Sequence, residues 1–393
     1  MTYENPYINS STWTELNILE TLRKRNPLII CITNDVVRTF TANGLLAIGA
    51  SPVMSECSED LEDLIVHASA LLINIGTLTP DKVSYYKDAI ALAKKHEVPI
   101  VLDPVGCHAG VYRLSVVLDL IKTDAISLLR GNQSEIKAIY DALNTNHKVN
   151  NSLSGKGVDG EQVEDSAIIT YRLARQINCP VVATGEEDYV SDGTRVFAVP
   201  HGHPIMTAVT GTGCLLGAVL AAFFSSYCPF MYNMSIGEFL AYALAYYGLA
   251  GESAVNVSGV KPGSFSMAFM DALYEFDDAM LLSENRIRPV VVPDQLKVYF
   301  ISGTQDVGFN ESYLLDIVEA ACRGGATCFQ FREKGIGTLE GQQKLELAQQ
   351  LKEICAMYNV LYIINDDVDL AVAVNADGVH VGQEDMRLED VRN

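Results

Sequence analysis

Short, almost wholly apolar runs alternate with amphipathic stretches through the first 285 residues, and this alternation limits the possible folds more than any other feature. Each run closes near a Gly, Pro, Thr or Asp; the runs are PLIICIT (27–33), ALLINIG (70–76), VPIVLDP (98–104), AISLLRG (125–131) and PVVATGE (180–186). Strands that are apolar along their whole length are typical of parallel sheets covered by helices on both faces. The pattern therefore predicts an α/β fold, whose ligands bind beyond the carboxyl ends of the strands.

The segment SENRIRPVVVPDQ (283–295) marks the clearest seam in the chain. It follows a helical pattern, carries charges and two prolines, and precedes a fresh strand pattern. We therefore expect one domain at residues 1–285, a linker at 286–295 and a second domain at 296–393.

Strand and helix patterns alternate regularly after the seam. The strand patterns are LKVYFIS, TCFQFRE, LYIIND and GVHVGQE, and helical patterns separate them. This is the rhythm of a β/α barrel, which needs about eight such repeats to close. The sequence thus predicts the first half of a TIM-type β/α barrel at 296–393.

Charge and cysteine usage exclude several partners. The formal net charge of −21 repels phosphate backbones, so we expect no nucleic-acid partner. The nine cysteines are scattered without a C-x-x-C pair, which argues against a disulfide framework or zinc site and favours the cytoplasm. The first residues show no basic and apolar leader pattern.

Residues 204–237 contain no Asp, Glu, Lys or Arg and could be mistaken for a membrane segment. Their solid apolar run, 214–224, is shorter than the ~20 residues that a spanning helix needs. We therefore expect a buried helix here and no membrane partner.

The segment AVTGTGCLLGAVLAAFF (208–224) is the sharpest chemical signal. Glycines at 211 and 213 precede or open a helix predicted to start near residue 212, with Cys214 in its first turn. Such a turn can cradle a phosphoryl group, although a glycine-rich helix start packed on the sheet would look the same. The helix N-terminus is expected to lower the pKa of the Cys214 thiol and make it a proton acceptor; the alternative is a small buried residue.

A second cluster lies in LLRGNQSEI (128–136). Asn132 and Glu135 share a helix face and could hold Mg²⁺ through its waters, but Asn-x-x-Glu is also a capping box. Arg130 suits a nucleotide phosphate, and Asp103 at another strand end is a further candidate for the metal environment.

Eight segments in order resemble hydroxyethylthiazole kinase, a ribokinase-like enzyme: CITNDVVRTFTANGLLAIGASPVMSE (31–56), NIGTL (74–78), VLDPVG (101–106), RGNQSEI (130–136), KGVDG (156–160), VVATGEEDYV (181–190), VTGTGCLLGAV (209–219) and KPGSF (261–265). The resemblance implies a three-layer α/β/α fold and a transferase that phosphorylates 4-methyl-5-(2-hydroxyethyl)thiazole for thiamine biosynthesis. ATP would be the co-substrate and Mg²⁺ the cofactor, and the family is a homotrimer with sites between subunits.

Residue by residue, this resemblance implies a set of contacts. Met54 and Gly211 would contact the thiazole, Arg130 and Thr184 would contact ATP, Asp103 and Glu135 would lie near Mg²⁺, and Cys214 would lie at the acceptor hydroxyl. The loop GCHAG (106–110) departs from the plainer small-residue loop that the family pattern suggests, and we expect His108 there to lie on the surface.

The second domain resembles thiamine-phosphate synthase in CFQFREK (328–334), IINDDVDLA (363–371) and ADGVHVGQED (376–385). That enzyme joins the thiazole phosphate to an aminopyrimidine diphosphate. The likeness covers the first half of the family's barrel, so we expect no synthase activity from residues 1–393 alone. By resemblance, the residues that would bind a pyrimidine diphosphate are Gln330, Arg332, Glu333, Lys334 and Asn365. Those that would bind Mg²⁺ are Asp366 and Asp385.

Two alternatives remain from the residues themselves. The first domain could be another ribokinase-like kinase that acts on a pyrimidine or sugar alcohol, and the second a non-catalytic appendage. Cys214 within GTGC and the SPVM segment (51–54) favour the thiazole.

Overall fold

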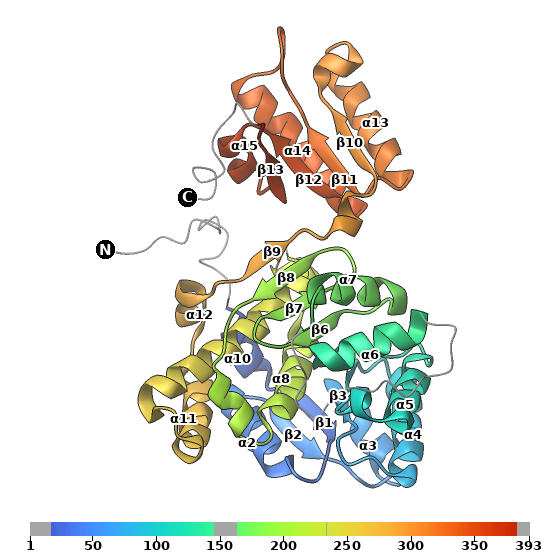
Figure 1. The fold of residues 1–393 in the computed structure, drawn as a ribbon, viewed down its shortest axis with the longest axis vertical. Coiled ribbons are helices and arrows are strands. Elements are labelled where there is room, and N and C mark those ends of the chain that lie inside the picture. The colour runs from blue at the N-terminus through green and yellow to red at the C-terminus, as the bar shows by residue number, and fades with distance from the viewer. Residues whose placement is uncertain (1–16, 145–162, 233, 383–393) are drawn as a thin grey trace. The chain divides into compact units, whose positions relative to one another are not determined.

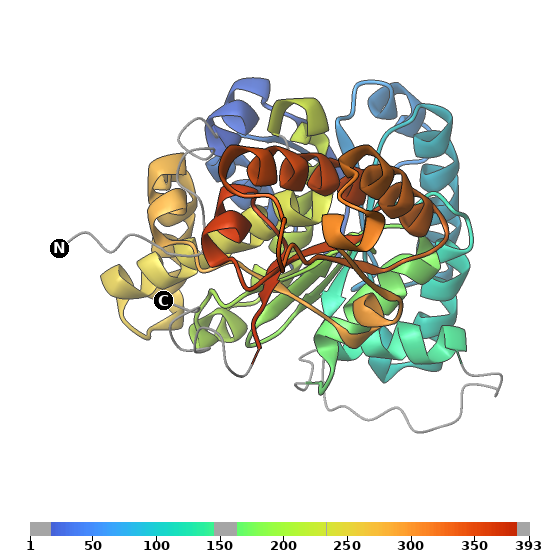
Figure 2. The same ribbon diagram turned by 90° about the horizontal axis from the view of Figure 1, so that it is seen from above.

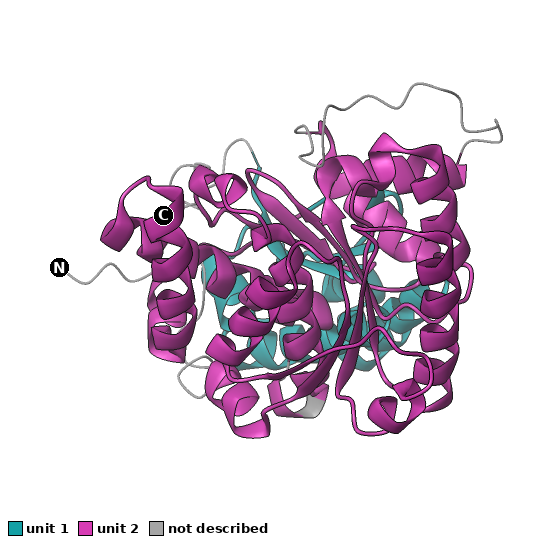
Figure 3. Ribbon diagram, turned by 90° about the horizontal axis from the view of Figure 1, so that it is seen from below, with its two compact units in different colours: residues 1–14, 291–393 teal, residues 15–290 magenta. Residues whose placement is uncertain are grey.

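The computed structural model describes residues 17–144, 163–232 and 234–382 (Figure 1). The chain divides into two compact units, one at residues 15–290 and the other from Val291 onward, which Figure 3 colours separately. Residues 288–290, inside the segment that the sequence suggests as a linker, form a strand of the larger unit.

The larger unit is built on one sheet with the strand order β2-β1-β3-β4-β5-β6-β7-β8-β9. The apolar runs form β1, β3, β4, β5 and β6, as the sequence predicts. Neighbouring strands are parallel from β2 to β6, and β7, β8 and β9 continue the sheet antiparallel. The strands are β1 (Leu28–Ile32), β2 (Ser51–Met54), β3 (Ala70–Asn74), β4 (Ile100–Asp103), β5 (Leu128–Asn132), β6 (Val181–Thr184), β7 (Asp188–Ser191), β8 (Val196–Val199) and β9 (Arg288–Val290).

Helices cover both faces of this sheet, which confirms the three-layer α/β/α architecture (Figure 2, Figure 3). One layer packs on alternate strand residues such as Ile30, Leu71 and Leu102. It comprises α3 (Leu61–Ile65), α4 (Pro80–Lys95), α5 (Val111–Ile121), α6 (Gln133–Asn144) and α7 (Ser166–Ile177). The other layer contains α1 (Ile18–Arg25), α2 (Arg38–Ile48), α8 (Thr212–Ser226), α9 (Pro229–Tyr232), α10 (Ile236–Ser258), α11 (Pro262–Glu275) and α12 (Asp278–Glu284).

Helix α8 occupies the segment without charged residues and is buried along most of its length. It packs on β1, β3 and β4 and is covered by α2 and α10. Burying one large apolar side chain such as Phe223 stabilises the fold by ~1.5–3 kcal/mol. Within the described part of the chain, no helix combines the length and the apolar character needed to cross a bilayer.

The smaller unit has a parallel sheet in the order β10-β11-β12-β13, consistent with a partial TIM-type barrel. Phe329 and Tyr362 point toward the helices, whereas Cys328, Leu361 and Ile363 form a separate cluster. This split follows from the alternation of side chains along a strand. The elements are β10 (Tyr299–Ser302), α13 (Glu311–Arg323), β11 (Cys328–Phe331), α14 (Gly341–Met357), β12 (Leu361–Asn365), α15 (Val368–Ala373) and β13 (Gly378–His380).

Candidate active site

Polar residues end four adjacent strands of the larger unit. Asn74 ends β3 and pairs in register with Asp103, which ends β4. Asn132 ends β5 and pairs with Thr184, which ends β6. Because these strands are parallel, their carboxyl ends lie along the same edge of the sheet, where ligands of such folds bind.

Arg130 joins two of the predicted positions. Its Nη2 donates a hydrogen bond to Thr184 Oγ1 at 2.9 Å, and its Nη1 lies 3.5 Å from Asp103 Oδ2. Arg130 is 7% exposed and Asp103 is fully buried, and charges at that depth are normally paired. The structure thus brings together the residues that the resemblance assigns to ATP and to the metal.

The two carboxylate oxygens of Asp103 differ in their hydrogen bonding. Asp103 Oδ2 accepts a hydrogen bond from Asn74 Nδ2 at 2.8 Å, whereas Oδ1 has no hydrogen-bond partner among the described residues. Burial raises the pKa of Asp103 to about 6, and the nearby Arg130 opposes that rise. Leaving a buried acceptor unsatisfied costs ~1–3 kcal/mol, so a donor or cation at Oδ1 would be favourable.

Glu135 forms the capping box that the sequence left as one alternative. Asn132 Oδ1 accepts from the Glu135 N–H at 2.8 Å, and Glu135 Oε2 accepts from the Asn132 N–H at 2.7 Å. Glu135 Oε1 also accepts from the Gly106 N–H at 2.7 Å. Burial, and then the negative charge of Asp103, raise the pKa of Glu135 to about 7. Each carboxylate oxygen keeps a second lone pair with which it could accept a hydrogen bond from a metal-bound water.

Helix α8 begins at Thr212, which confirms the start expected from the sequence. Gly211 caps it with φ 103°, and a Cβ there would lie 3.0 Å from Phe40. Cys214 lies in the first turn, half-buried, and its Sγ accepts a hydrogen bond from Asn34 Nδ2 at 3.3 Å.

The expected lowering of the Cys214 pKa is wrong. Burial, and then the charge of Asp103, raise the pKa of this thiol to about 11, despite the opposing effects of the Asn74 side chain, the charge of Arg130 and the hydrogen bond from Asn34. A helix N-terminus is worth ~0.3–1 kcal/mol, less than the 1.36 kcal/mol of one pKa unit. Loss of hydration therefore outweighs the helix, and the thiol is protonated at neutral pH.

Two asparagines complete the site and were not singled out from the sequence. Asn34 Nδ2 donates to Asn74 Oδ1 at 3.0 Å as well as to Cys214, so these amides link Cys214 to Asp103. Both are buried. The available signal was a carboxamide within or just after an apolar run, in ALLINIG and after PLIICIT.

Met54 and His108 complete the kinase positions. Met54 ends β2, is half-buried, and pairs in register with Cys31 of β1. His108 is 4% exposed, so the surface position expected for it is wrong. The GCHAG loop folds into a short 3₁₀ turn (Cys107–Ala109) that buries both Cys107 and His108.

In the smaller unit, the strand-end residues contact one another. Lys334 Nζ donates to Asp366 Oδ2 at 2.7 Å. The Glu333 carboxylate accepts from the N–H groups of Thr304 at 2.8 Å and Leu339 at 2.9 Å, and also from the Thr304 hydroxyl.

The remaining positions of that unit differ in exposure. Gln330 is buried, Asn365 is half-buried at the end of β12, and Arg332 is exposed. Asp385 and the KGVDG segment lie outside the described residues.

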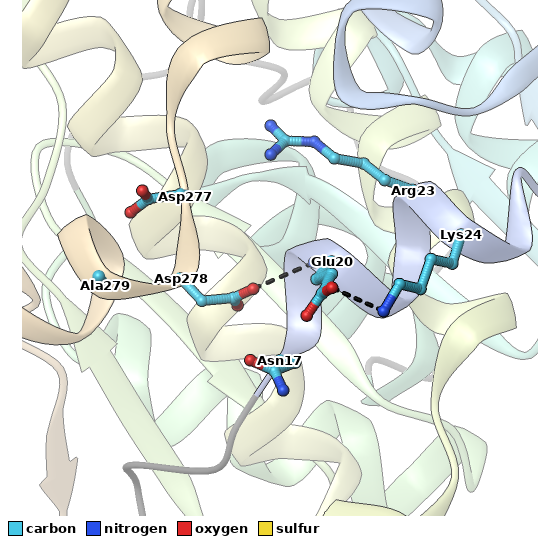
Figure 4. A pocket seen from close by; sticks show the side chains of 7 residues that line it. All are labelled: Asn17, Glu20, Arg23, Lys24, Asp277, Asp278 and Ala279. Carbon is cyan, nitrogen blue, oxygen red and sulfur yellow. Dashed lines mark hydrogen bonds and ion pairs between the residues drawn. The ribbon is translucent and has the colours of Figure 1, made fainter.

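A shallow pocket between α1 and α12 of the larger unit lies apart from these strand ends (Figure 4). Its polar groups serve the fold: Asp278 accepts from the N–H groups of Leu19 and Glu20, and Glu20 pairs with Lys24. The lining residues are Asn17, Glu20, Arg23, Lys24, Asp277, Asp278 and Ala279.

Both units are similar to known proteins. The model of the hydroxyethylthiazole kinase family matches residues 19–279, and that of thiamine monophosphate synthase matches residues 298–393. The chain is 48% identical over 267 residues to a hydroxyethylthiazole kinase of Streptococcus agalactiae serotype Ia, covering 68% of this chain and 99% of that protein. It is 47% identical to one of Streptococcus suis over 65% of this chain and 93% of that one.

A solved structure agrees with the sequence matches. The hydroxyethylthiazole kinase from Pyrococcus horikoshii OT3 aligns with a TM-score of 0.61 at 36% identity, covering 70% of this chain and 98% of that chain.

Proposed function

We propose, since the chain belongs to the hydroxyethylthiazole kinase family, that its larger unit transfers the γ-phosphoryl group of ATP to the hydroxyl of 4-methyl-5-(2-hydroxyethyl)thiazole. The product would serve thiamine biosynthesis or salvage. The observation that carries the proposal is the buried Arg130–Asp103 pair beside the first turn of α8.

The anion cradle would be formed by α8 and Arg130 together. A Cβ added at Gly213 would lie 3.7 Å from Arg130 Nη2, so the guanidinium is next to the first helical turn. The free N–H groups of that turn and a guanidinium both stabilise charge on a transferring phosphoryl group. Arg130 and Thr184 would contact ATP, consistent with their hydrogen bond at the strand ends.

Two carboxylates fit a magnesium ion at this edge. Asp103 offers the unpartnered Oδ1, and Glu135 offers the second lone pairs of its oxygens. Within the described residues, no group of three or more His, Cys, Asp or Glu side chains clusters as a metal cage. That suits Mg²⁺, which is commonly held by one or two carboxylates, waters and substrate phosphates. When bound, the ion would neutralise charge on the phosphates of ATP.

The proton of the acceptor hydroxyl must leave as the new O–P bond forms and the bond to ADP breaks. We place Cys214 at that hydroxyl, with its sulfur as the proton acceptor. Asn74, Arg130 and Asn34 favour the thiolate, whereas burial and the charge of Asp103 oppose it. Burial keeps this thiol protonated at neutral pH, so only its thiolate form can accept the proton, and turnover would rise with pH toward the pKa of Cys214.

Met54 and Gly211 would contact the thiazole. We also propose a cytoplasmic homotrimer with sites between subunits. Three exposed apolar side chains are candidates for the subunit interface: Val257 at the end of α10, Val260 in the connection that follows, and Met267 on α11.

The smaller unit resembles thiamine-phosphate synthase. We propose that it binds an aminopyrimidine diphosphate at the strand ends around Lys334 and Asp366. Arg332, exposed next to them, would contact the diphosphate.

The kinase proposal is tested by coupled measurement of ADP release with the thiazole alcohol, ATP and Mg²⁺, and by mass detection of the phosphorylated thiazole. The matching aminopyrimidine alcohol is the comparison substrate. We expect turnover with the thiazole. Absence of ATP consumption with it, or faster turnover of the pyrimidine alcohol, would refute the proposal.

A further inference from the structure

The side chain of Asn74, at the end of β3, is fully buried and hydrogen-bonded from both ends of its carboxamide. Asn74 Nδ2 donates to Asp103 Oδ2 at 2.8 Å. Asn74 Oδ1 accepts from Asn34 Nδ2 at 3.0 Å and from the Gly76 N–H at 3.0 Å. One amide therefore touches the strand β4 carboxylate on one side and the loop after β1 on the other.

The orientation of this amide follows from its partners. A backbone N–H can only donate, so the Asn74 atom that faces Gly76 is the oxygen. The nitrogen must then face Asp103, and Asn34 must present its amino group to Asn74. The second hydrogen of that amino group is available for Cys214 Sγ, 3.3 Å away.

Two local features make this arrangement possible. The parallel register of β3 and β4 sets Asn74 directly beside Asp103. Gly76 allows Asn34 to approach, because a Cβ at that position would lie 2.8 Å from the Asn34 side chain.

We infer that Asn74 is a positioning residue for phosphoryl transfer, holding Asp103 directly and Cys214 through Asn34. This inference rests on the proposed kinase function. By occupying Asp103 Oδ2, Asn74 leaves Oδ1 as the oxygen without a hydrogen-bond partner among the described residues. By orienting Asn34, it directs an N–H at the sulfur that lies beside the acceptor hydroxyl. A displacement of ~1 Å at a reacting centre can cost about 10²-fold in rate.

Two variants test the nitrogen and the oxygen of the Asn74 carboxamide. Asn74→Asp has the same shape and keeps an acceptor for Asn34 and Gly76, but it sets an oxygen against Asp103 Oδ2. Asn74→Leu has similar size and removes both ends. We expect each to lower kcat by ~10–100-fold while the KM values for the thiazole alcohol and ATP change by less than about threefold, because positioning is lost and substrate contacts are kept.

The matched control is Asn285→Asp with Asn285→Leu. Asn285 is also a buried asparagine, and its Nδ2 donates to the carbonyls of Leu281 and Leu282 at the end of α12, outside the site. These variants report the general cost of altering a buried amide. We expect them to lower thermal stability without a selective loss of kcat.

A second readout does not depend on turnover. The rate at which iodoacetamide alkylates Cys214, followed by peptide mass spectrometry, reports on how strongly the amides of Asn34 and Asn74 favour the thiolate. One hydrogen bond is worth ~0.5–1.5 kcal/mol, so we expect alkylation in Asn74→Leu to be about two- to tenfold slower than in the wild type.

An unchanged alkylation rate in Asn74→Leu would overturn the inference whatever the activity. So would a folded Asn74→Asp enzyme with wild-type kcat, or losses that match the Asn285 variants. If the wild type itself does not phosphorylate the thiazole alcohol, the proposed function fails. The alkylation comparison then still decides whether Asn74 orients the Cys214 side.

Discussion

The guanidinium of Arg130 lies 3.5 Å from the carboxylate of Asp103, and both groups are withdrawn from solvent. The pair joins β4 to β5 at the edge where α8 begins. Neither partner can be changed alone without leaving a buried charge unpaired, so stability and catalysis are linked at this point.

Replacing Arg130 by Gln should therefore lower both the free energy of unfolding and ATP turnover. Removing one partner of a buried pair costs ~3–5 kcal/mol. The double variant Arg130→Gln with Asp103→Asn should lose less stability than the sum of the single losses, because neither charge is then stranded. Urea unfolding of the two single variants and the double variant measures their free energies of unfolding. If the losses of the single variants add up to that of the double variant, the pairing is contradicted.

Cys214→Ala should lower kcat by ~10²–10⁴-fold with little change in the KM for ATP, because the sulfur acts on the acceptor hydroxyl. Cys214→Asp should retain activity, since a carboxylate there can also accept a proton and the hydrogen bond from Asn34. Cys228→Ala is the matched control at another half-buried thiol. A folded but inactive Asp variant would indicate that Cys214 serves packing alone.

Gly211 and Gly213 should respond differently to alanine. Gly211 has φ 103° and a Cβ there would crowd Phe40, so Gly211→Ala should destabilise the protein by ~1–3 kcal/mol. Gly213 is helical and its Cβ would make ordinary contact with Arg130, so Gly213→Ala should keep stability but narrow the phosphate cradle and raise the KM for ATP. Thermal melts and steady-state kinetics on both variants test this contrast, and equal melting temperatures would refute it.

Glu135 should make the protein without nucleotide or metal less stable as pH rises from about 4.5 to about 7. Its pKa is raised from 4.5 to about 7 in the fold, mainly by burial. Over that range the unfolded chain releases the proton while the folded chain keeps it, so rising pH favours unfolding. Glu135→Gln should flatten this part of the profile, measured as the urea midpoint against pH. An identical slope in the variant would show that Glu135 does not titrate there.

In the smaller unit, the Glu333 carboxylate accepts hydrogen bonds from the N–H groups of Thr304 and Leu339. Glu333→Gln should weaken these bonds and loosen the two loops. Hydrogen bonds to a charged group contribute ~1.5–3 kcal/mol each. Amide hydrogen exchange should accelerate at those two residues and leave kinase turnover unchanged. Glu340→Gln, an exposed carboxylate nearby, is the control. If both variants exchange alike, Glu333 has no such structural role.

The sequence predicted the parallel part of the sheet because strands buried on both faces leave an uninterrupted apolar signal. It did not predict β2, β7, β8 and β9; SPVM and RPV contain proline, and DYVS is not a continuous apolar run. Charged strand-end residues such as Asp103 and Arg130 were found by their position. Asn34 and Asn74 were missed because an uncharged amide stands out only when its partners are known.

Depth of burial was the other quantity that the sequence could not supply. It reversed the expected direction of the Cys214 pKa and moved His108 from the surface into the fold. Local patterns identify helix starts well, since Gly211 and Thr212 carry that signal themselves. How much protein covers the first turn depends on α2 and α10, which are distant in sequence.

Strand β9 sets the C-terminal boundary at which the larger unit can be expressed without the smaller one. It pairs antiparallel with β8, and just before it the Arg286 N–H donates to His201 Nε2 at 2.9 Å and the guanidinium donates to Glu252 Oε1 at 2.7 Å. A stop codon after residue 285 would delete these bonds and bare the edge of β8, a template for aggregation. To express the kinase by itself, the reading frame should run through Val290, where the larger unit ends.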